Sequence, residues 1–232
     1  MKIGLLADIH GNAHALAAVL DAASAAGVSR LLIAGDFVGY YHEPGRVMAL
    51  LADWSWDGVR GNHDEMLRGW PERPDRDEIR RRYGSGLEIA ATELARNQID
   101  ALLSLPVSRE CTLDERRALL CHGTPWDADM YVYPDAPADL RRRFVALGRD
   151  LTVFGHTHYP VEWSEQPTLV VNPGSVGQPR DRKPGACWAI WDTEDRRVTL
   201  RRETYDMAPV IALAAQRDPD LPFLATVLTR TH

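Results

Sequence analysis

The sequence is poor in cysteine. Its 232 residues contain only Cys111, Cys121 and Cys187, an odd number with no closely spaced pair. A disulfide framework or a zinc site built from thiolates needs paired cysteines, so this pattern argues against both. We expect the three to be small buried hydrophobic residues.

Long apolar runs and a charged leader segment are also missing. No stretch approaches the length that spans a bilayer, and Met1-Lys2-Ile3-Gly4 leads directly into a predicted strand. We therefore expect a soluble, cytoplasmic protein. There is no internal repeat, low-complexity tract or linker, so with 45% hydrophobic residues we expect one domain over residues 1–232.

The chain lacks an excess of basic residues. It has 27 Lys and Arg against 33 Asp and Glu, a formal charge of −6. Proteins with a broad nucleic-acid surface are normally basic, so no such surface is expected. A small phosphorylated substrate such as a nucleotide is compatible with this charge, because divalent ions would set the local electric field of its pocket.

Several short apolar runs are followed directly by polar side chains of the metal-ligand type. The runs at 2–7, 30–34, 118–120 and 151–154, with a shorter one ending at Val59, are typical of buried parallel strands. The side chains that follow them are Asp8, His10, Asp36, Asn62, His122, His156 and His158. Because open α/β sheets bind ligands at the carboxyl ends of their strands, these side chains are predicted to converge.

The seven side chains offer carboxylate, amide and imidazole atoms. This donor set suits Mn²⁺, Fe²⁺, Zn²⁺, Ni²⁺ or Co²⁺. Seven ligands are more than one tetrahedral ion binds, but they suffice for two ions if one carboxylate bridges the two. A lone Asp after a strand is commonly a cap, and a lone His is often a satisfied polar group, so the prediction depends on the complete set.

Five motifs resemble the signature blocks of the calcineurin-like metallophosphoesterases. They are Asp8-x-His10, Gly35-Asp36, Gly61-Asn62-His63-Asp64, His122-Gly123 and Gly155-His156-x-His158. Segments 8–12, 35–40 and 172–180 are similar to the small prokaryotic phosphodiesterase-like branch. The resemblance extends from Met1 to about Asp206 and implies an α/β fold, a four-layer αββα sandwich of two mixed sheets flanked by helices.

The resemblance also implies a role for each matching residue. Asp8, His10, Asp36 and His158 would hold one ion, and Asp36, Asn62, His122 and His156 the other. A hydroxide bridging the two ions would then attack phosphorus in line. His63 would assist the leaving oxygen without binding metal, and Asp64 would orient the His63 ring and raise its basicity.

One departure from the family pattern bears on the substrate. Phosphoprotein phosphatases and diadenosine tetraphosphatases usually carry an arginine soon after the second block, but here segment 37–44 has none, and Asp64 stands where they have Glu. A phosphodiester has less charge to neutralise than an ionised monoester, so a diester is favoured. The alternatives are a phosphomonoesterase, a nucleotide pyrophosphatase or dinucleoside polyphosphate hydrolase, and a non-catalytic scaffold, against which His63 and Asp64 argue.

Three further features have both a structural and a functional explanation. Segment 69–86 is either a solvated loop with a short helix or a cap that places an arginine on the substrate. Turn 174–177 either closes a sheet or cradles phosphate with backbone N–H groups. Loop aromatic side chains either pack together or stack a nucleobase: Tyr40, Tyr41, His42, Trp126, Tyr131 and Tyr133.

Elsewhere the pattern predicts helices over 12–26, 46–54, 87–105 and 138–147 and a hairpin over 107–121 that turns at Asp114-Glu115. Strand-like runs at 168–171, 186–191 and 198–202 suggest that the β-rich end forms a second sheet packed on the first. His14 and His232 are expected on the surface.

Overall fold

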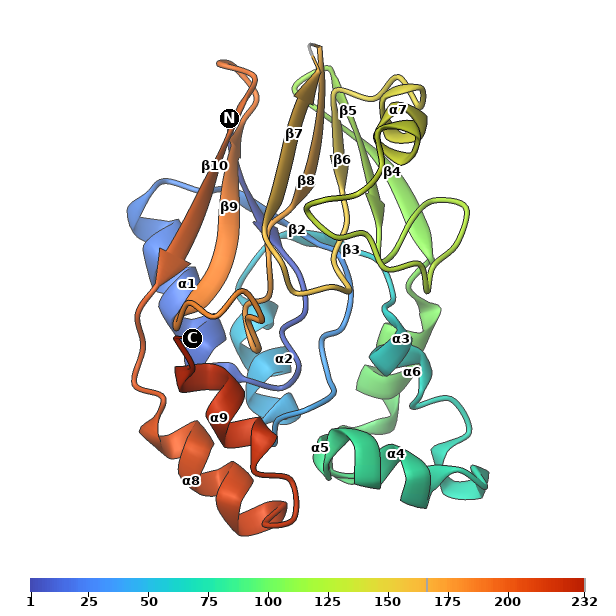
Figure 1. Cartoon of the computed structure of the whole chain (residues 1–232), viewed down its shortest axis with the longest axis vertical. Helices are drawn as coiled ribbons and strands as arrows, with labels where there is room; N and C mark the ends of the chain where they lie inside the picture. The colour runs from blue at the N-terminus through green and yellow to red at the C-terminus, as the bar shows by residue number, and fades with distance from the viewer. Residues whose placement is uncertain (166, 232) are drawn as a thin grey trace.

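Two five-stranded sheets pack face to face in the computed structural model, which describes residues 1–165 and 167–231 (Figure 1). The first has the order β10-β9-β1-β2-β3: Arg197–Glu203, Ala186–Asp192, Lys2–Leu6, Arg30–Ile33 and Trp56–Gly58. The second has the order β4-β5-β6-β8-β7: Ser108–Leu113, Arg116–Cys121, Leu151–Val153, Thr168–Asn172 and Val161–Glu165.

The inner faces of the two sheets form one apolar core. Leu5, Leu32, Leu120 and Val153 are completely buried there, together with Trp191 from β9. Strands β1, β2 and β3 are parallel in the first sheet, and β5, β6 and β8 are parallel in the second. Burial on both faces explains the continuous apolar runs, and parallel pairing brings the carboxyl ends of each set to a common edge.

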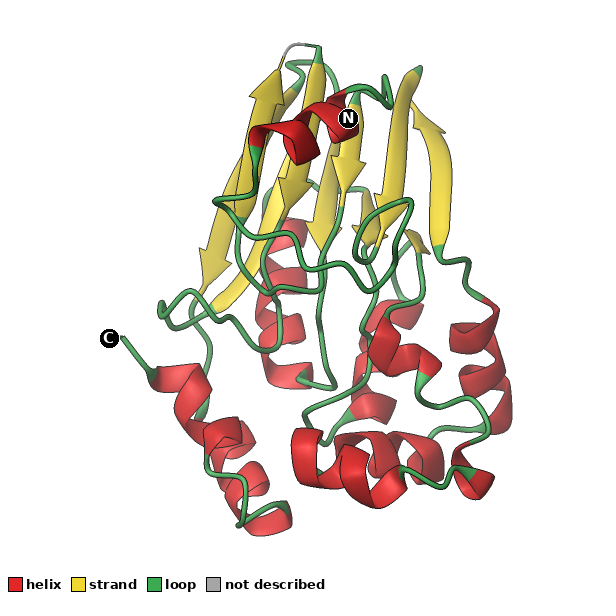
Figure 2. Cartoon of the chain, turned by 45° about the vertical axis from the view of Figure 1, so that its right-hand side comes forward, coloured by secondary structure: helices red, strands yellow, loops and turns green. Residues whose placement is uncertain are grey.

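Helices cover the outer faces of the sandwich. Helices α1 (Ala13–Ala25) and α2 (Pro44–Ala52) pack on the first sheet, and α7 (Ala138–Val145) lies across the second through Phe144 (Figure 2). A helical segment links β3 to β4: α3 (Asn62–Glu65), η1 (Trp70–Glu72), α4 (Arg76–Tyr83), α5 (Gly86–Glu93) and α6 (Arg96–Ser104). These layers confirm the expected four-layer α/β sandwich.

The N-terminus of α1 is capped as predicted. The side-chain oxygen of Asn12 accepts the Ala15 N–H at 3.1 Å, which satisfies one of the helix's free donors. Its amide nitrogen donates to the carbonyl of Gly177 at 2.9 Å and to Tyr205 Oη at 3.0 Å. One buried side chain thus joins α1 to the segment after β8 and to the segment after β10.

Several local predictions are confirmed, and two are wrong. The hairpin forms as expected, with Asp114 and Glu115 both at positive φ, as a tight turn between twisted strands requires. The helix predicted over 87–105 instead breaks into α5 and α6, because Leu94 and Ala95 are extended and the Ala95 N–H bonds Gln98.

The second wrong prediction concerns the C-terminal strands. Strands β9 and β10 join the first sheet because β9 pairs with β1, so only β8 of the three predicted strands belongs to the second sheet. Strand β7 and two C-terminal helices, α8 (Ala208–Arg217) and α9 (Phe223–Thr229), were not predicted. No helix within 1–165 and 167–231 is both long and apolar enough to cross a bilayer. His232 lies outside the described residues.

Candidate metal centre

The structure brings all seven predicted ligand residues together where the strands of both sheets end. Asp8 and His10 follow β1, Asp36 follows β2, and Asn62 begins α3. His122 follows β5, and His156 and His158 follow β6. All but Asn62 are buried. Ligand-type side chains from five separate segments of the chain therefore meet in one crevice.

Most of these residues have a left-handed backbone conformation, which is unusual for residues other than glycine. Five of the nine non-glycine residues recorded at positive φ are predicted ligands: Asp8 at 54°, His10 at 52°, Asp36 at 56°, His156 at 71° and His158 at 63°. Side chains disfavour this left-handed region, and such conformations persist where surrounding structure enforces them, most often at functional sites. The left-handed residues turn the chain sharply after each strand.

The Nε2 atoms of His10 and His158 face each other, and neither carries a proton that could form a hydrogen bond between them. Their Nδ1 atoms lie 3.2 Å from the Val38 carbonyl and 2.7 Å from the Gln178 carbonyl, so each Nδ1 is the protonated donor. The two Nε2 atoms then carry lone pairs and lie 3.0 Å apart. A cation between them would satisfy both lone pairs.

A second group with the same character surrounds His122. Its Nδ1 donates to the Ala34 carbonyl at 2.8 Å, so in the neutral ring the lone pair lies on Nε2. That lone pair lies 3.0 Å from the Asn62 side-chain oxygen and 3.1 Å from Nδ1 of His156. Nε2 of His156 lies 3.2 Å from the Asp129 carbonyl and is its donor, so its Nδ1 also carries a lone pair.

Asp36 lies between the two groups. Its Oδ2 is 3.6 Å from His10 Nε2 and 3.3 Å from His122 Nε2. Asp8, His10 and His158 offer ligand atoms within 4.8 Å of one another, as do Asp8, Asp36 and His122. Oδ2 of Asp8 is buried and has no hydrogen-bond partner among the residues that the structure describes. Converging lone pairs and carboxylates, each fixed by a backbone contact, fit bound divalent cations.

The electrostatics of the crevice keep most of its imidazoles neutral. Burial lowers the pKa of His156 to about 4 and the pKa values of His10 and His158 well below the usual range. Burial also opposes protonation of His122, but the Asp36 carboxylate outweighs this effect and raises the pKa of His122 to about 10, so a metal ion that bound there would displace a proton. Neutral imidazole is the form that binds metal.

His63 lies at the site as predicted, but its predicted contact with Asp64 is replaced by others. Asp64 does not orient the His63 ring, because its two oxygens accept the backbone N–H groups of Asp36, Phe37, Val38 and Gly61. The His63 ring is held by edge contacts to His10, at 4.8 Å between centroids, and to Tyr83, at 4.7 Å. Burial also lowers its pKa to about 4 instead of raising its basicity.

Asp64 is therefore expected to position the loop that carries Asp36. In Asp64→Asn, one carboxylate oxygen becomes an NH₂ group that faces two N–H donors, and each unpaired buried donor costs about 1–3 kcal/mol. We expect the melting temperature to fall by several degrees. Asp100→Asn, which removes an exposed pair with Arg96, is the control and should change it little. Equal melting curves for the two variants would contradict this role.

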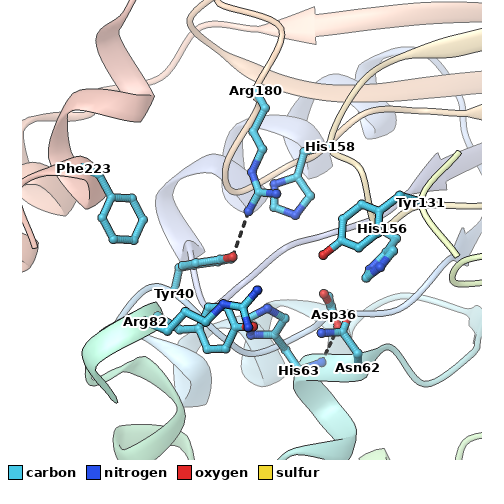
Figure 3. Close-up of a pocket in the computed structure, with 11 residues that line it drawn as sticks. Asp36, Tyr40, Asn62, His63, Arg82, Tyr131, His156, His158, Arg180 and Phe223 are labelled. Atoms are coloured by element: carbon cyan, nitrogen blue, oxygen red, sulfur yellow. Dashed lines mark hydrogen bonds between the residues drawn. The ribbon is translucent and has the colours of Figure 1, made fainter. Parts of the chain in front are cut away.

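A cavity of about 180 Å³ opens directly onto these residues (Figure 3). Asp36, Asn62, His63, His156 and His158 form its floor. The remaining lining residues come from α4, α9 and three loops: Tyr40, Arg82, Tyr83, Tyr131, Arg180 and Phe223. Arg180 belongs to the family-like segment 172–180, and Arg82 to segment 69–86, in which a substrate-contacting arginine was one of the two explanations. Tyr83 and Phe223 had no sequence signal.

The loop aromatic residues separate into two sets. Tyr40 and Tyr131 line the cavity, whereas Trp126 packs 5.1 Å from Phe144 behind the second sheet. Tyr133 is exposed, 6.1 Å from Tyr131. Tyr41 and His42 are buried away from the cavity: Tyr41 Oη donates to the Leu224 carbonyl, and His42 Nε2 lies 2.8 Å from Asp218. His14 lies on α1 beside Glu43, at 3.3 Å.

Turn 174–177 supports the metal centre from behind. The N–H groups of Val176 and Gly177 donate to the carbonyls of Ala7 and Asp8, at 3.0 Å each. The Ser175 hydroxyl donates to the same Asp8 carbonyl at 2.7 Å. These donors are already bonded to the protein, which favours the structural explanation of the turn: it fixes the backbone that presents Asp8.

A second cavity, of about 440 Å³, reaches the metal centre from another side. It is lined by Asn62 and His122 together with residues of the α3 segment and the loop after β5, among them Arg60, Met66 and Asp129. Asn62 lines both cavities. The crevice therefore extends in two directions from the ligand residues.

Comparisons with known proteins agree with this geometry. A sequence model described as the calcineurin-like phosphoesterase superfamily domain matches residues 1–196. An uncharacterized protein of Methanocaldococcus jannaschii is 30% identical over 223 residues, 88% of each chain. A metallophosphoesterase from Sphaerobacter thermophilus is 28% identical, with a TM-score of 0.79 over 100% of this chain and 99% of that one. A hypothetical protein from Pyrococcus horikoshii is 20% identical, with a TM-score of 0.83 over 100% and 98%.

Proposed function

The chain belongs to the calcineurin-like phosphoesterase superfamily, and we propose that it is a dinuclear metal-dependent phosphoric ester hydrolase that prefers small phosphodiesters. The observation that carries this proposal is the set of histidine lone pairs that converge around Asp36. We further propose that residues 1–232 act as one domain in which segment 69–86 forms a wall of the substrate cavity through α4.

The proposed ligand sets follow the two groups of side chains. Asp8, His10 and His158 would hold one ion, and Asn62, His122 and His156 the other, with Asp36 shared. Bound divalent ions supply charge neutralisation and an activated water to phosphoester hydrolysis. The donor set does not choose among Mn²⁺, Fe²⁺, Zn²⁺, Ni²⁺ and Co²⁺.

The protein's own groups would orient the ester. His63 lies on the cavity floor next to Asn62, with its Nδ1 buried and free of hydrogen bonds within 1–165 and 167–231. From there its ring can donate a hydrogen bond to the departing oxygen. Asp64 would hold the backbone of Asp36 in the position from which the Asp36 carboxylate can bind both ions.

Two cavities meeting at Asn62 favour a diester over a monoester. A phosphodiester carries an organic group on each of two ester oxygens, whereas a monoester carries one. The 180 Å³ cavity can accept one group and the 440 Å³ cavity the other, while phosphorus lies near Asn62 and Asp36.

The proposal predicts metal-dependent hydrolysis of bis-p-nitrophenyl phosphate. Purified protein with added Mn²⁺ should release p-nitrophenol, and EDTA should abolish the release until excess Mn²⁺ restores it. p-Nitrophenyl phosphate, measured in parallel, should be the poorer substrate by kcat/KM. No hydrolysis of either ester with any of the five metals would favour the non-catalytic scaffold, and faster monoester hydrolysis would favour a phosphomonoesterase.

A further inference from the structure

Two arginines in the 180 Å³ cavity have no carboxylate partner. Within residues 1–165 and 167–231, neither Arg82 nor Arg180 has an ion pair, whereas Arg30, Arg73 and Arg202 each bond an aspartate. The Arg82 guanidinium lies over the Tyr83 ring at 5.1 Å, and among the described residues the Arg180 guanidinium bonds only the neutral Tyr40 hydroxyl and Gln178 side chain. The cavity therefore holds two guanidinium groups that form no ion pair with a carboxylate of the described residues.

Arg180 is held in a fixed position. Its Nη2 donates to Tyr40 Oη at 2.8 Å and to the Gln178 side chain at 3.0 Å, and its backbone carbonyl accepts Arg230 Nη2 at 3.2 Å. Figure 3 shows its guanidinium beside His158 and its bond to Tyr40, with Arg82 on the side of His63. A guanidinium whose position is already set loses little freedom when it binds an anion.

The C-terminal helices complete this part of the cavity. Asp218, after α8, accepts the Ser85 N–H and hydroxyl at 2.9 Å each and contacts His42 Nε2 at 2.8 Å. These buried bonds fix the helical pair against the start of α5. They bring Phe223 to 6.3 Å from Tyr40, so a segment beyond the matched family region forms one wall.

The number of positive charges indicates what the cavity binds. If two divalent ions were bound, their four positive charges would face the carboxylates of Asp8, Asp36 and Asp64, a hydroxide and the single charge of a phosphodiester. The five negative charges would offset the ions and only one of the two arginines, so a second anionic group of the substrate would complete the neutralisation. A terminal phosphate, with about two negative charges, has the matching charge and the oxygen geometry that guanidinium groups bind.

On these grounds, and on the basis of the proposed function, we propose that Arg82 and Arg180 form a subsite for a second phosphate, so that the substrate is a phosphodiester with a terminal phosphate on one arm. Pockets that enclose whole small-molecule ligands measure about 300–1,000 Å³. At 180 Å³ this cavity accommodates the phosphate and the adjoining part of one arm, lined by Tyr40, Tyr83 and Phe223.

The test uses two dinucleotides that differ only in a terminal phosphate, 5′-phosphorylated diadenylate and unphosphorylated adenylyl-adenosine. The ratio of their kcat/KM values in the metal-loaded enzyme should favour the phosphorylated one by about tenfold or more, as charged hydrogen bonds typically give. Equilibrium binding of both to the EDTA-treated protein should show a preference in the same direction, since the arginines need no metal to bind phosphate.

Arg82→Gln and Arg180→Gln should each bring both ratios toward one without lowering hydrolysis of the unphosphorylated dinucleotide as much. Two exposed arginines serve as matched controls, Arg81→Gln from α4 and Arg182→Gln from the loop of Arg180, and both should keep the preference. Equal turnover and binding of the two dinucleotides by the native protein would overturn the subsite while the hydrolase assignment stands. Preferential binding without hydrolysis of any ester would support the subsite and overturn the proposed function.

Discussion

Replacing Asp36 by alanine is expected to remove bound metal and to lower kcat for bis-p-nitrophenyl phosphate by more than about 100-fold, since loss of even an outer-shell partner of a metal costs 10–100-fold. Asp36 has this large effect because its Oδ2 lies within 3.6 Å of ring nitrogens in both histidine groups. Metal content per chain, measured by elemental analysis after dialysis, should fall together with activity.

Two further variants make the Asp36 result interpretable. Oδ1 of Asp36 also accepts the His63 N–H at 2.9 Å, so alanine leaves that donor unpaired, whereas Asp36→Asn keeps a side-chain oxygen that can accept it. Asp53→Ala removes an exposed carboxylate at the end of α2 and should behave as native. If folded Asp36→Asn kept its full metal content and turnover, Asp36 would not be the shared ligand.

His63→Ala is expected to have the second large effect, a fall in kcat of about 10²–10⁴-fold, the usual contribution of a positioned proton donor or acceptor. The metal content should not change, because the proposed ligand sets do not include His63. KM should change less than kcat if the His63 contact strengthens as the leaving oxygen departs. Steady-state kinetics and elemental analysis of one preparation measure both quantities.

The metal measurement also tests an alternative for His63. His10, Asp36 and His63 offer ligand atoms within 4.8 Å of one another, so the three could hold an ion by themselves. If His63→Ala lost metal in proportion to activity, His63 would be a ligand. Unchanged turnover would remove it from the reaction altogether. A side chain at Gly39, which stands at φ 151°, would collide with the His10 ring and lie 3.0 Å from His63 Nδ1, so it would disturb a proposed metal ligand as well as His63.

The candidate ligands could be predicted from the sequence because each lies immediately after a buried strand. The order of apolar run and polar residue is local, and parallel strands bring their carboxyl ends to one edge whatever their exact pairing. Thus Asp8, Asp36, His122 and His156 were identifiable without coordinates, and the structure brings them together. The αββα layers followed from the same alternation of strands and helices and from the family resemblance.

Contacts between distant segments could not be predicted in this way. The two carboxylate oxygens of Asp64 accept backbone N–H groups. Every residue except proline has such a group, so the sequence does not show which ones a carboxylate will meet, and the predicted contact of Asp64 with the His63 ring is wrong. Likewise, the pairing of β9 with β1 joins segments more than 180 residues apart and depends on which apolar faces pack together.

The sequence by itself therefore determined the chemistry of the centre, because ligand atoms are set by residue type and by position at strand ends. Only the tertiary structure decided what surrounds it. Arg82, Arg180 and Phe223 come from three distant segments, and the packing of α4, the loop after β8 and α9 brings them into one cavity. Segment 37–44 has no arginine, so the sequence predicted a substrate site with few positive side chains. In the folded chain, Arg82 and Arg180 from two other segments line the cavity.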